Sequence, residues 1–431
     1  MPTIRIVTVP AKNYYSARES LELMRPIAAQ VIDDIVKALT TPLTEAEKNP
    51  KIEVEGCEPI TVTAESYTAA IEKLNQLFLD NRWSDALPIV PPTREAVDWM
   101  LTGTSRSPNE VVGRVAPKNG LATIEKIAIN AVMAGAKPEY LPVIIAAIEG
   151  LTDKSYDLLH LQTSTGSITP VIIVNGPIVK EIGMNSKIGF LGDGWRANST
   201  IGRAVNLCLI NLGWTWPQVN DQGLMGRPEV YCGFTFAENE EDSPWPPYHV
   251  RHGFKPDQST VTVSSGMVYD RMGPGGAVSP QTMKEALNTL AWMVARMGTP
   301  ATYSFRTWIY MKKYIITIHP ALARALAKAG YTPESLAQWL YEHARFPYKD
   351  LRPRDTAALR KYMKKGLIPP EVLTEEDLKQ GRSIPAVISP DQLHIFVAGG
   401  EPAYCALWCD PKGPKHVTKL IHGATLTKAG R

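Results

Sequence analysis

The sequence predicts an α/β protein with a mixed sheet and helices on both faces, plus a small N-terminal α/β arm or lobe. Apolar runs that end at Gly or Pro alternate with amphipathic helical repeats along the chain, a pattern typical of α/β folds. An apolar fraction of 44% and a charged fraction of 21% indicate a globular chain. Its 431 residues exceed the ~250–300 residues at which one core stops growing, so two or three domains are expected.

Residues 1–80 are expected to form the N-terminal lobe, or an arm that docks on a partner subunit. The apolar segment Ile4–Val9 predicts a strand, and apolar residues at helical spacing predict a helix from about Ser16 to Leu39. After a charged linker, a second strand is expected at Ile52–Thr63 and a second helix from about Ala64. These elements make up only a fragment of an α/β unit.

Residues 81–270 are expected to form the main α/β domain. The prolines that precede Thr93 impose extended backbone, and Thr93 can cap the helix that follows. Ala122–Gly135 and Pro138–Leu151 predict two apolar core helices, each too short to span a membrane. Pro170–Gly176 is an apolar run that ends in Asn-Gly, which predicts a buried strand finishing in a turn.

Residues 271–431 are expected to form a C-terminal α/β part with a basic tail. The predicted elements are the helix Pro280–Met297, the strand Tyr314–Ile318, the helices Pro320–Ala329, Pro333–Ala344 and Asp355–Lys365, and the strand Leu393–Ala398. After Asp410 the chain carries five Lys or Arg and no acid. Because the net charge is only +3, a solvated tail or one docked on a partner subunit is favoured over a nucleic-acid-binding arm.

The sequence also indicates the expected cellular location of the protein. The N-terminus lacks the pattern of a secretory signal, and no run of about 18 apolar residues occurs, so a cytoplasmic protein with no membrane segment is expected. An odd number of scattered cysteines argues against a disulfide scaffold and for reduced thiols. The cysteines are Cys57, Cys208, Cys232, Cys405 and Cys409.

The glycine-rich run from Gly189 to Arg203 is the first candidate site. It opens a helix with an apolar face, and free N–H groups at a helix start bind anions. The candidate substrate-binding residues are Arg196, Asn198, Ser199, Thr200 and Arg203. An ordinary capped helix after a flexible loop is the alternative, because neither a Walker pattern nor a dinucleotide-binding pattern is present.

The acidic loop from Phe236 to Phe254 is the second candidate site. It holds four acids, two histidines and an arginine. Carboxylates close to a histidine can share general acid and base work, so Glu238, Glu240 and His249 are the candidate catalytic residues. An acidic surface turn is the alternative, and a metal site is disfavoured because no paired-ligand spacing is present.

Cys405 and Cys409 are the third candidate, as catalytic thiols. They follow a predicted strand and a glycine pair, where α/β proteins often place ligand-binding loops. A thiolate there can act as a nucleophile or a redox centre, although the spacing is not that of Cys-x-x-Cys. Zinc would need His416 and His422 as further ligands, and buried structural thiols are the remaining alternative.

Several segments together resemble a bacterial family of conserved proteins without an assigned reaction. The matching segments are Asp85–Thr93 (Asp-Ala-Leu-Pro-Ile-Val-Pro-Pro-Thr), Glu125–Gly135, Asn175-Gly-Pro, Arg196–Arg203 (Arg-Ala-Asn-Ser-Thr-Ile-Gly-Arg), Glu238–Trp245 and Val397–Gly400. The family usually has glycine at the position of Ala86. The resemblance implies that the glycine-rich run, the acidic loop and the strand end near Gly400 line one composite pocket, with Asn130 and Asn175 as further substrate-binding candidates.

The segment Ile4–Thr41 is similar to the closing strand and helix of the UGSC-type (seleno)protein domain, although the Gly-Ser-Cys motif itself is absent. This resemblance implies a hetero- or homo-oligomer, in which the chain is the large subunit of an enzyme whose small subunit carries Cys-Gly-Ser-Cys thiols.

The expected function is therefore an enzyme, or the large subunit of one, that acts on a small polar or anionic substrate. The expected chemistry is a thiol-assisted reduction, elimination or hydrolysis. A non-catalytic binding or scaffold subunit and a zinc-stabilised metalloprotein are the alternatives.

Overall fold

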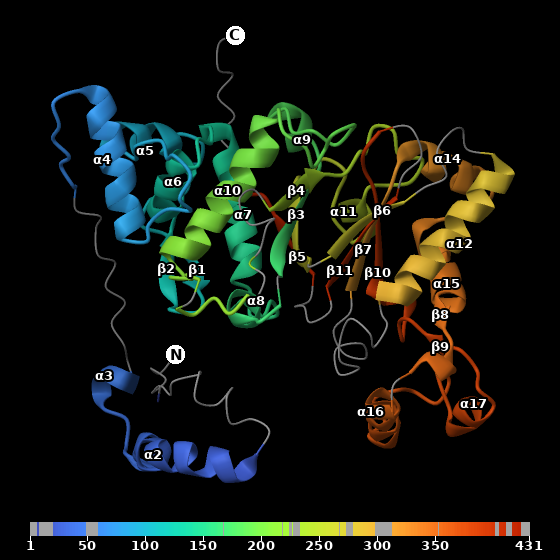
Figure 1. Ribbon diagram of the computed structural model, residues 1–431. Helices are drawn as coiled ribbons and strands as arrows, with labels where there is room; N and C mark the ends of the chain where they lie inside the picture. Colours follow the sequence, from blue (N-terminus) through green and yellow to red (C-terminus); the bar gives the residue numbers. More distant parts are fainter. Residues whose placement is uncertain are drawn as a thin grey trace. The chain divides into compact units, whose positions relative to one another are not determined.

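The computed structural model divides into two compact units, residues 1–60 and residues 61–431 (Figure 1). The structure describes residues 7, 20–48, 59–166, 168–217, 219–223, 226, 233–266, 268–272, 279–297, 313–351, 353–400, 405–410 and 416–423. Helix α4 (Tyr67–Asp80), which the sequence places in the N-terminal lobe, belongs to the second unit.

The first unit contains helices α2 (Leu21–Thr40) and α3 (Glu45–Lys48) in its described part. The hydroxyl of Ser20 caps α2 by accepting a hydrogen bond from the N–H of Leu23 at 3.4 Å. None of the residues of α2 is buried. The predicted strand Ile4–Val9 and most of Ile52–Thr63 lie outside the described residues, and residues 59–63 are not in a strand.

The first sheet has the strand order β12-β5-β3-β4. Strand β3 (Thr169–Asn175) is parallel to β4 (Phe234–Ala237) and antiparallel to β5 (Thr260–Gly266). Strand β12 (Val417–Leu420) pairs with β5, so the end of the described chain returns to the first sheet. The predicted strand at Pro170–Gly176 is confirmed.

The second sheet has the strand order β10-β7-β11-β6. Strands β7 (Lys313–Ile318) and β10 (Leu393–Val397), the two strands predicted in this region, are parallel. Strand β11 (Cys405–Asp410) is antiparallel to both β7 and β6 (Val268–Met272). Residues 405–410 therefore form a strand, where a loop was expected.

The two sheets pack face to face. Because side chains alternate between the two faces of a strand, every second residue of a strand points toward the other sheet. Val171, Ile173 and Phe236 of the first sheet pack with Ile315 and Phe396 of the second. The alternate residues of each sheet pack against helices on its outer face. The result is a layer of helices, two mixed sheets and a second layer of helices, which confirms the α/β class (Figure 1).

Helices α6 (Ile124–Met133), α7 (Leu141–Leu151) and α10 (Arg196–Asn211) supply the helical side of the first core. Helices α12 (Pro280–Met297), α14 (Pro320–Lys328) and α15 (Pro333–His343) supply that of the second core. The predicted helices at these places are confirmed. No helix in the described part of the chain is long and apolar enough to cross a bilayer.

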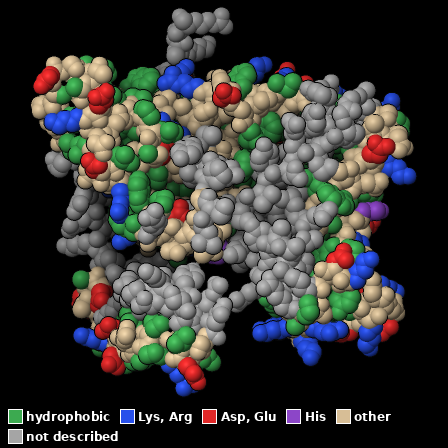
Figure 2. All heavy atoms as spheres, viewed as in Figure 1, with side chains coloured by type: hydrophobic (Ala, Val, Ile, Leu, Met, Phe, Trp, Pro, Cys, Tyr) green, Lys and Arg blue, Asp and Glu red, His purple; other side chains and the backbone are tan. Residues whose placement is uncertain are grey.

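The remaining elements connect or extend these layers. They are α5 (Arg94–Leu101), β1 (Val111–Val115), β2 (Gly120–Thr123), the 3-10 helix Pro138–Tyr140, α8 (Leu158–Thr163), α9 (Ile178–Glu181), α11 (Tyr248–Arg251), β8 (Arg345–Phe346), the 3-10 helix Tyr348–Asp350, α16 (Pro353–Lys364), α17 (Glu375–Lys379), β9 (Ile384–Pro385) and the 3-10 helix Pro390–Gln392. Thr93 caps α5, as predicted. Lys and Arg side chains gather over α16 (Figure 2).

Candidate functional site

Arg203, predicted to bind an anion, instead holds another part of the chain. Its Nε and Nη2 atoms donate to the two carboxylate oxygens of Asp85 at 2.9 and 3.0 Å. Nη2 also donates to the carbonyls of Leu87 and Pro88 at 3.3 and 2.9 Å. The Asp85 side chain is only 3% exposed. We call Asp85, Arg203 and these two carbonyls the arginine clamp, which joins two motifs 118 residues apart.

The start of α10 is also engaged with neighbouring chain segments. Arg196, which is exposed, donates from Nε to the carbonyl of Gly135 at 2.9 Å. The buried amide of Asn198 accepts from the N–H of Asn185 at 2.9 Å and donates to the carbonyls of Asn185 and Phe190 at 2.9 and 3.1 Å. These side chains therefore stabilise the glycine-rich run itself.

Ser199, Thr200 and Asn130 complete the predicted substrate-binding set around α10. The hydroxyl of Thr200 donates to the carbonyl of Arg196 at 2.7 Å, and Ser199 is half-buried beside it. Asn130 is buried, and its Oδ1 accepts from Nδ2 of Asn211 at 2.6 Å, between α6 and α10. The structure thus gives Thr200 and Asn130 contacts within and between helices.

A second polar network lies where β3 and β4 end. Because these strands are parallel, their carboxyl ends meet at one edge of the sheet, the usual place for a site in an α/β fold. Nδ2 of Asn175 donates to Oε2 of Glu238 at 2.6 Å and to Oε1 of Glu240 at 2.8 Å. The N–H of Gly176 also donates to Oε1 of Glu240 at 2.8 Å. One amide therefore holds two carboxylates.

Gly176 must be glycine for this geometry. Its φ is +92°, and a Cβ there would lie 2.4 Å from the carbonyl oxygen of Gln258. The Asn-Gly pair that suggested a turn therefore also places a side-chain donor and a main-chain donor on Glu240.

Glu238 is buried, at 2% exposure, and its Oε2 also accepts from the N–H of Tyr248 at 2.8 Å. Burial raises the pKa of Glu238 to about 7, although the hydrogen bonds from Tyr248 and Asn175 and the charge of Arg251 act in the opposite direction. A carboxyl group with such a pKa can hold or release a proton near neutral pH.

His249 completes this network. It is fully buried, and its Nδ1 lies 3.6 Å from Oε1 of Glu240, beyond hydrogen-bond range. Burial lowers the pKa of His249, while the Glu240 carboxylate and the backbone of Lys255 act to raise it. Burial therefore favours the neutral imidazole, which has one nitrogen able to accept a proton while the Glu240 carboxylate beside it offsets part of the cost. We call Asn175, Glu238, Glu240 and His249 the carboxylate site.

The second sheet and the glycine-rich run reach the same edge. The N–H of Asn239 donates to the carbonyl of Val397 at 2.7 Å, and the N–H of Gly399 donates to the carbonyl of Ser186 at 2.8 Å. The amide of Asn198, at the start of α10, donates to the carbonyl of Thr235 in β4 at 3.5 Å. The segments of the expected composite pocket are therefore neighbours.

Sequence reasoning missed three residues of these networks, Asp85, Asn239 and Tyr248. Asp85 was visible only as part of a motif, without its partner. The hydroxyl of Tyr248 lies 2.9 Å from Nδ1 of His394 in β10, and its ring stacks on His252 with the centroids 3.8 Å apart. The contact with His394 joins segments 146 residues apart, so no local pattern indicates it.

The side chains of Cys405 and Cys409 lie outside the described residues, so their predicted roles remain predictions. Among the side chains that the structure does describe, no group of three or more His, Cys, Asp or Glu residues is placed to hold a metal ion.

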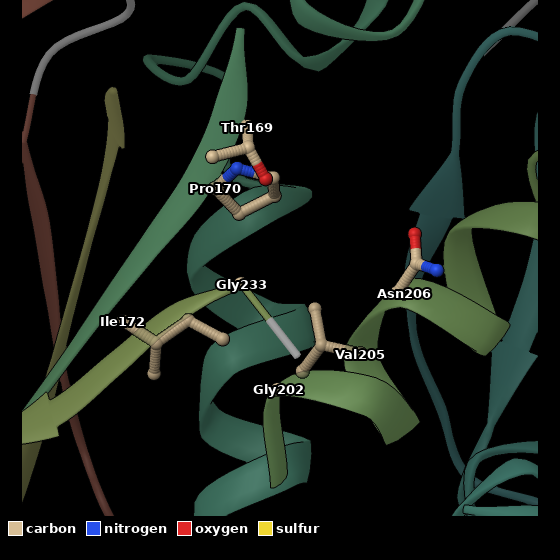
Figure 3. Close-up of a pocket in the computed structure, with 7 residues that line it drawn as sticks. All are labelled: Thr169, Pro170, Ile172, Gly202, Val205, Asn206 and Gly233. Carbon is tan, nitrogen blue, oxygen red and sulfur yellow. The ribbon is translucent and has the colours of Figure 1, made fainter. Parts of the chain in front are cut away.

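A small cavity of about 10 Å³, roughly the space of one water molecule, lies near the opposite end of β3 from Asn175 (Figure 3). It is lined by Thr169, Pro170, Ile172, Gly202, Val205, Asn206 and Gly233. Oγ1 of Thr169 and Nδ2 of Asn206 are buried and make no hydrogen bond with the described residues. This cavity is separate from the carboxylate site.

Comparisons of the chain with protein-family models, with curated proteins and with solved structures gave no match.

Proposed function

We propose that this chain is an enzyme, or the large subunit of one, that transfers protons on a small polar substrate at the carboxylate site. The observation that supports this most is the placement of a partly exposed carboxylate, Glu240, beside the buried His249 and Glu238. Pairs of titratable groups held in unlike environments are the means by which active sites separate acid from base.

Each residue has a distinct role in this proposal. Glu240, whose side chain is 24% exposed, contacts the substrate. His249 accepts a proton, and Glu238 stores one close to neutral pH. Asn175 and the N–H of Gly176 fix the position of Glu240. Elimination and hydrolysis both fit such a set, and a thiol, if one takes part, comes from Cys405, Cys409 or the small subunit.

Turnover of an unfractionated mixture of small metabolites tests the proposal. The natively purified protein, with any subunit that copurifies, is incubated with the mixture, and consumed compounds are followed by mass spectrometry. We expect Glu240→Gln to abolish consumption and Glu241→Gln to preserve it, because Glu241 is 77% exposed and pairs with Lys187 instead. Equal consumption by the wild type and Glu240→Gln would refute the role of Glu240.

We propose, second, that the first unit docks on a partner subunit. The observation behind this is that α2 has no buried residue, while Leu21, Ile32 and Leu39 are 75%, 50% and 80% exposed. In proteins, most of the stability of a helix comes from packing of its apolar face against other elements. Deletion of residues 1–48 is expected to release a copurifying subunit, and retention of that subunit would refute docking through α2.

A further inference from the structure

We infer that the carboxylate site binds the protonated amino group of a small organic cation through Glu240. This inference rests on the proposed function and specifies the substrate class, which the sequence left open between polar and anionic.

The hydrogen bonds of Glu240 involve only one of its two carboxylate oxygens. Its Oε1 accepts from Nδ2 of Asn175 and the N–H of Gly176, both at 2.8 Å, and faces Nδ1 of His249 at 3.6 Å. Its Oε2 accepts no hydrogen bond from the described residues. One oxygen is therefore fixed by the protein, while the other is left for a donor from outside.

Glu240 also contacts no Lys or Arg side chain in the part of the chain that the structure describes. Among the ion pairs of the described residues, the only partner of Glu240 is His249, which burial keeps neutral. The neighbouring acids differ in this respect, because Lys187 lies 3.1 Å from Glu241 and 3.4 Å from Asp242. A carboxylate that is held in place but lacks a counter-ion attracts a positively charged ligand.

The cations predicted to bind an anion are used elsewhere. Arg203 is held in the arginine clamp, and Arg196 donates to the carbonyl of Gly135. Arg251, the arginine of the acidic loop, donates to the carbonyl of Ile395 at 2.7 Å and pairs with Glu334 at 3.1 Å. In the described part of the chain, none of these arginines therefore contacts Glu240 to offset its charge.

Buried groups beside Glu240 point to a hydrogen-bonding ligand independently of charge. Among the described residues, no hydrogen bond of standard geometry reaches a ring nitrogen of His249 or Oδ1 of Asn175, although both residues are fully buried, and only Glu240 and the backbone of Lys255 act on the imidazole. Buried polar groups are normally satisfied in proteins, so such exceptions call for an explanation. An ammonium group has three donors and no acceptor, which suits Oε2 of Glu240, Oδ1 of Asn175 and the unprotonated ring nitrogen of His249.

Binding of simple probes to the full chain tests the inference. Ethanolamine and methylammonium are compared with glycolate and acetate by isothermal titration at low salt. We expect the two amines to bind and the two acids not to bind. Glu240→Gln is expected to weaken amine binding by about tenfold or more, because a charge-assisted hydrogen bond is lost. Glu241→Gln removes the same charge one residue away and is expected to change the affinity by about twofold or less.

The amide resonance of Gly176 gives a second readout in the unaltered protein, because its N–H donates to Glu240. We expect ethanolamine to shift this resonance and 0.5 M NaCl to reverse the shift. Binding of glycolate in preference to ethanolamine, or amine binding that Glu240→Gln leaves intact, would overturn the inference. Glu240-dependent consumption of metabolites would still support the proposed function in that case, so the two failures can be told apart.

Discussion

The arginine clamp and the carboxylate site are both buried polar networks, yet they differ in how completely their groups are satisfied. In the clamp, Arg203 matches both oxygens of Asp85 and two further carbonyls. In the carboxylate site, one amide serves two carboxylates, and no described residue hydrogen-bonds a ring nitrogen of His249 with standard geometry. A fully satisfied network fixes a fold, whereas an incompletely satisfied one indicates a place for a ligand.

The largest expected effect comes from breaking the clamp. Arg203→Ala leaves Asp85 buried without its counter-ion, and we expect a loss of about 3–5 kcal/mol in the free energy of unfolding. Urea denaturation measures this loss. Arg196→Ala is the matched control, because Arg196 is exposed and makes one hydrogen bond to Gly135, so a loss of about 1 kcal/mol or less is expected. Equal losses in both variants would contradict the structural role of Arg203.

In the carboxylate site, replacing the charged residue Glu238 is expected to raise the free energy of unfolding, whereas replacing Arg203 in the clamp lowers it. The pKa of Glu238 is about 7 in the folded protein and 4.5 without burial. The stability that this group contributes is thus fully present below pH 4.5 and is lost as the pH rises through 7, a change of about 3 kcal/mol. Glu238→Gln mimics the protonated form, so the variant is expected to exceed the wild type in stability at pH 8 and to equal it at pH 4.5.

Unfolding of both proteins between pH 4.5 and pH 8 checks this prediction. The lowered pKa of His249 contributes to the pH dependence of both proteins, so the difference between them is compared rather than either curve alone. A constant difference between Glu238→Gln and the wild type across this range would show that Glu238 is ionised throughout.

The local elements of this fold could be predicted from the sequence because their signals are local. Helical spacing of apolar residues identified α12 with its bounds, and the Asn-Gly ending identified β3. Thr93 was expected to cap a helix, and its hydroxyl accepts from the N–H of Ala96 at 3.2 Å. The clustering of acids and histidines within one loop singled out Glu238, Glu240 and His249, which the structure places together.

The pairing of distant segments could not be predicted. The sequence shows an arginine after a glycine-rich run but not that Asp85, 118 residues earlier, is its partner. It shows a basic tail but not that Val417–Leu420 returns to pair with β5. Such pairings depend on the packing of both cores, so helix starts were predicted well, whereas the partner of Arg203 at the start of α10 was not.

The cavity behind β3 tests whether unsatisfied buried atoms always mark function. Asn206→Leu removes the unpaired Nδ2 and adds apolar volume to the cavity. We expect a gain of about 1–2 kcal/mol in the free energy of unfolding, because a buried polar group without a partner costs about that much. Thr169→Val is expected to change stability in the same direction. Destabilisation in both variants would indicate that the cavity holds a polar guest.

The smallest expected effect concerns the backbone within the clamp segment. Ala86 has a φ of +68°, a backbone conformation that glycine adopts more readily than alanine. A left-handed conformation costs a non-glycine residue about 1–2 kcal/mol, and glycine adds about 0.5–1 kcal/mol of unfolded-state entropy. Ala86→Gly should therefore stabilise the protein by up to about 1 kcal/mol. Asn119→Gly, at a φ of +59°, is the control with a smaller gain, since asparagine tolerates this conformation. A loss of stability in Ala86→Gly would mean that the methyl group of Ala86 contributes more by packing than its backbone costs.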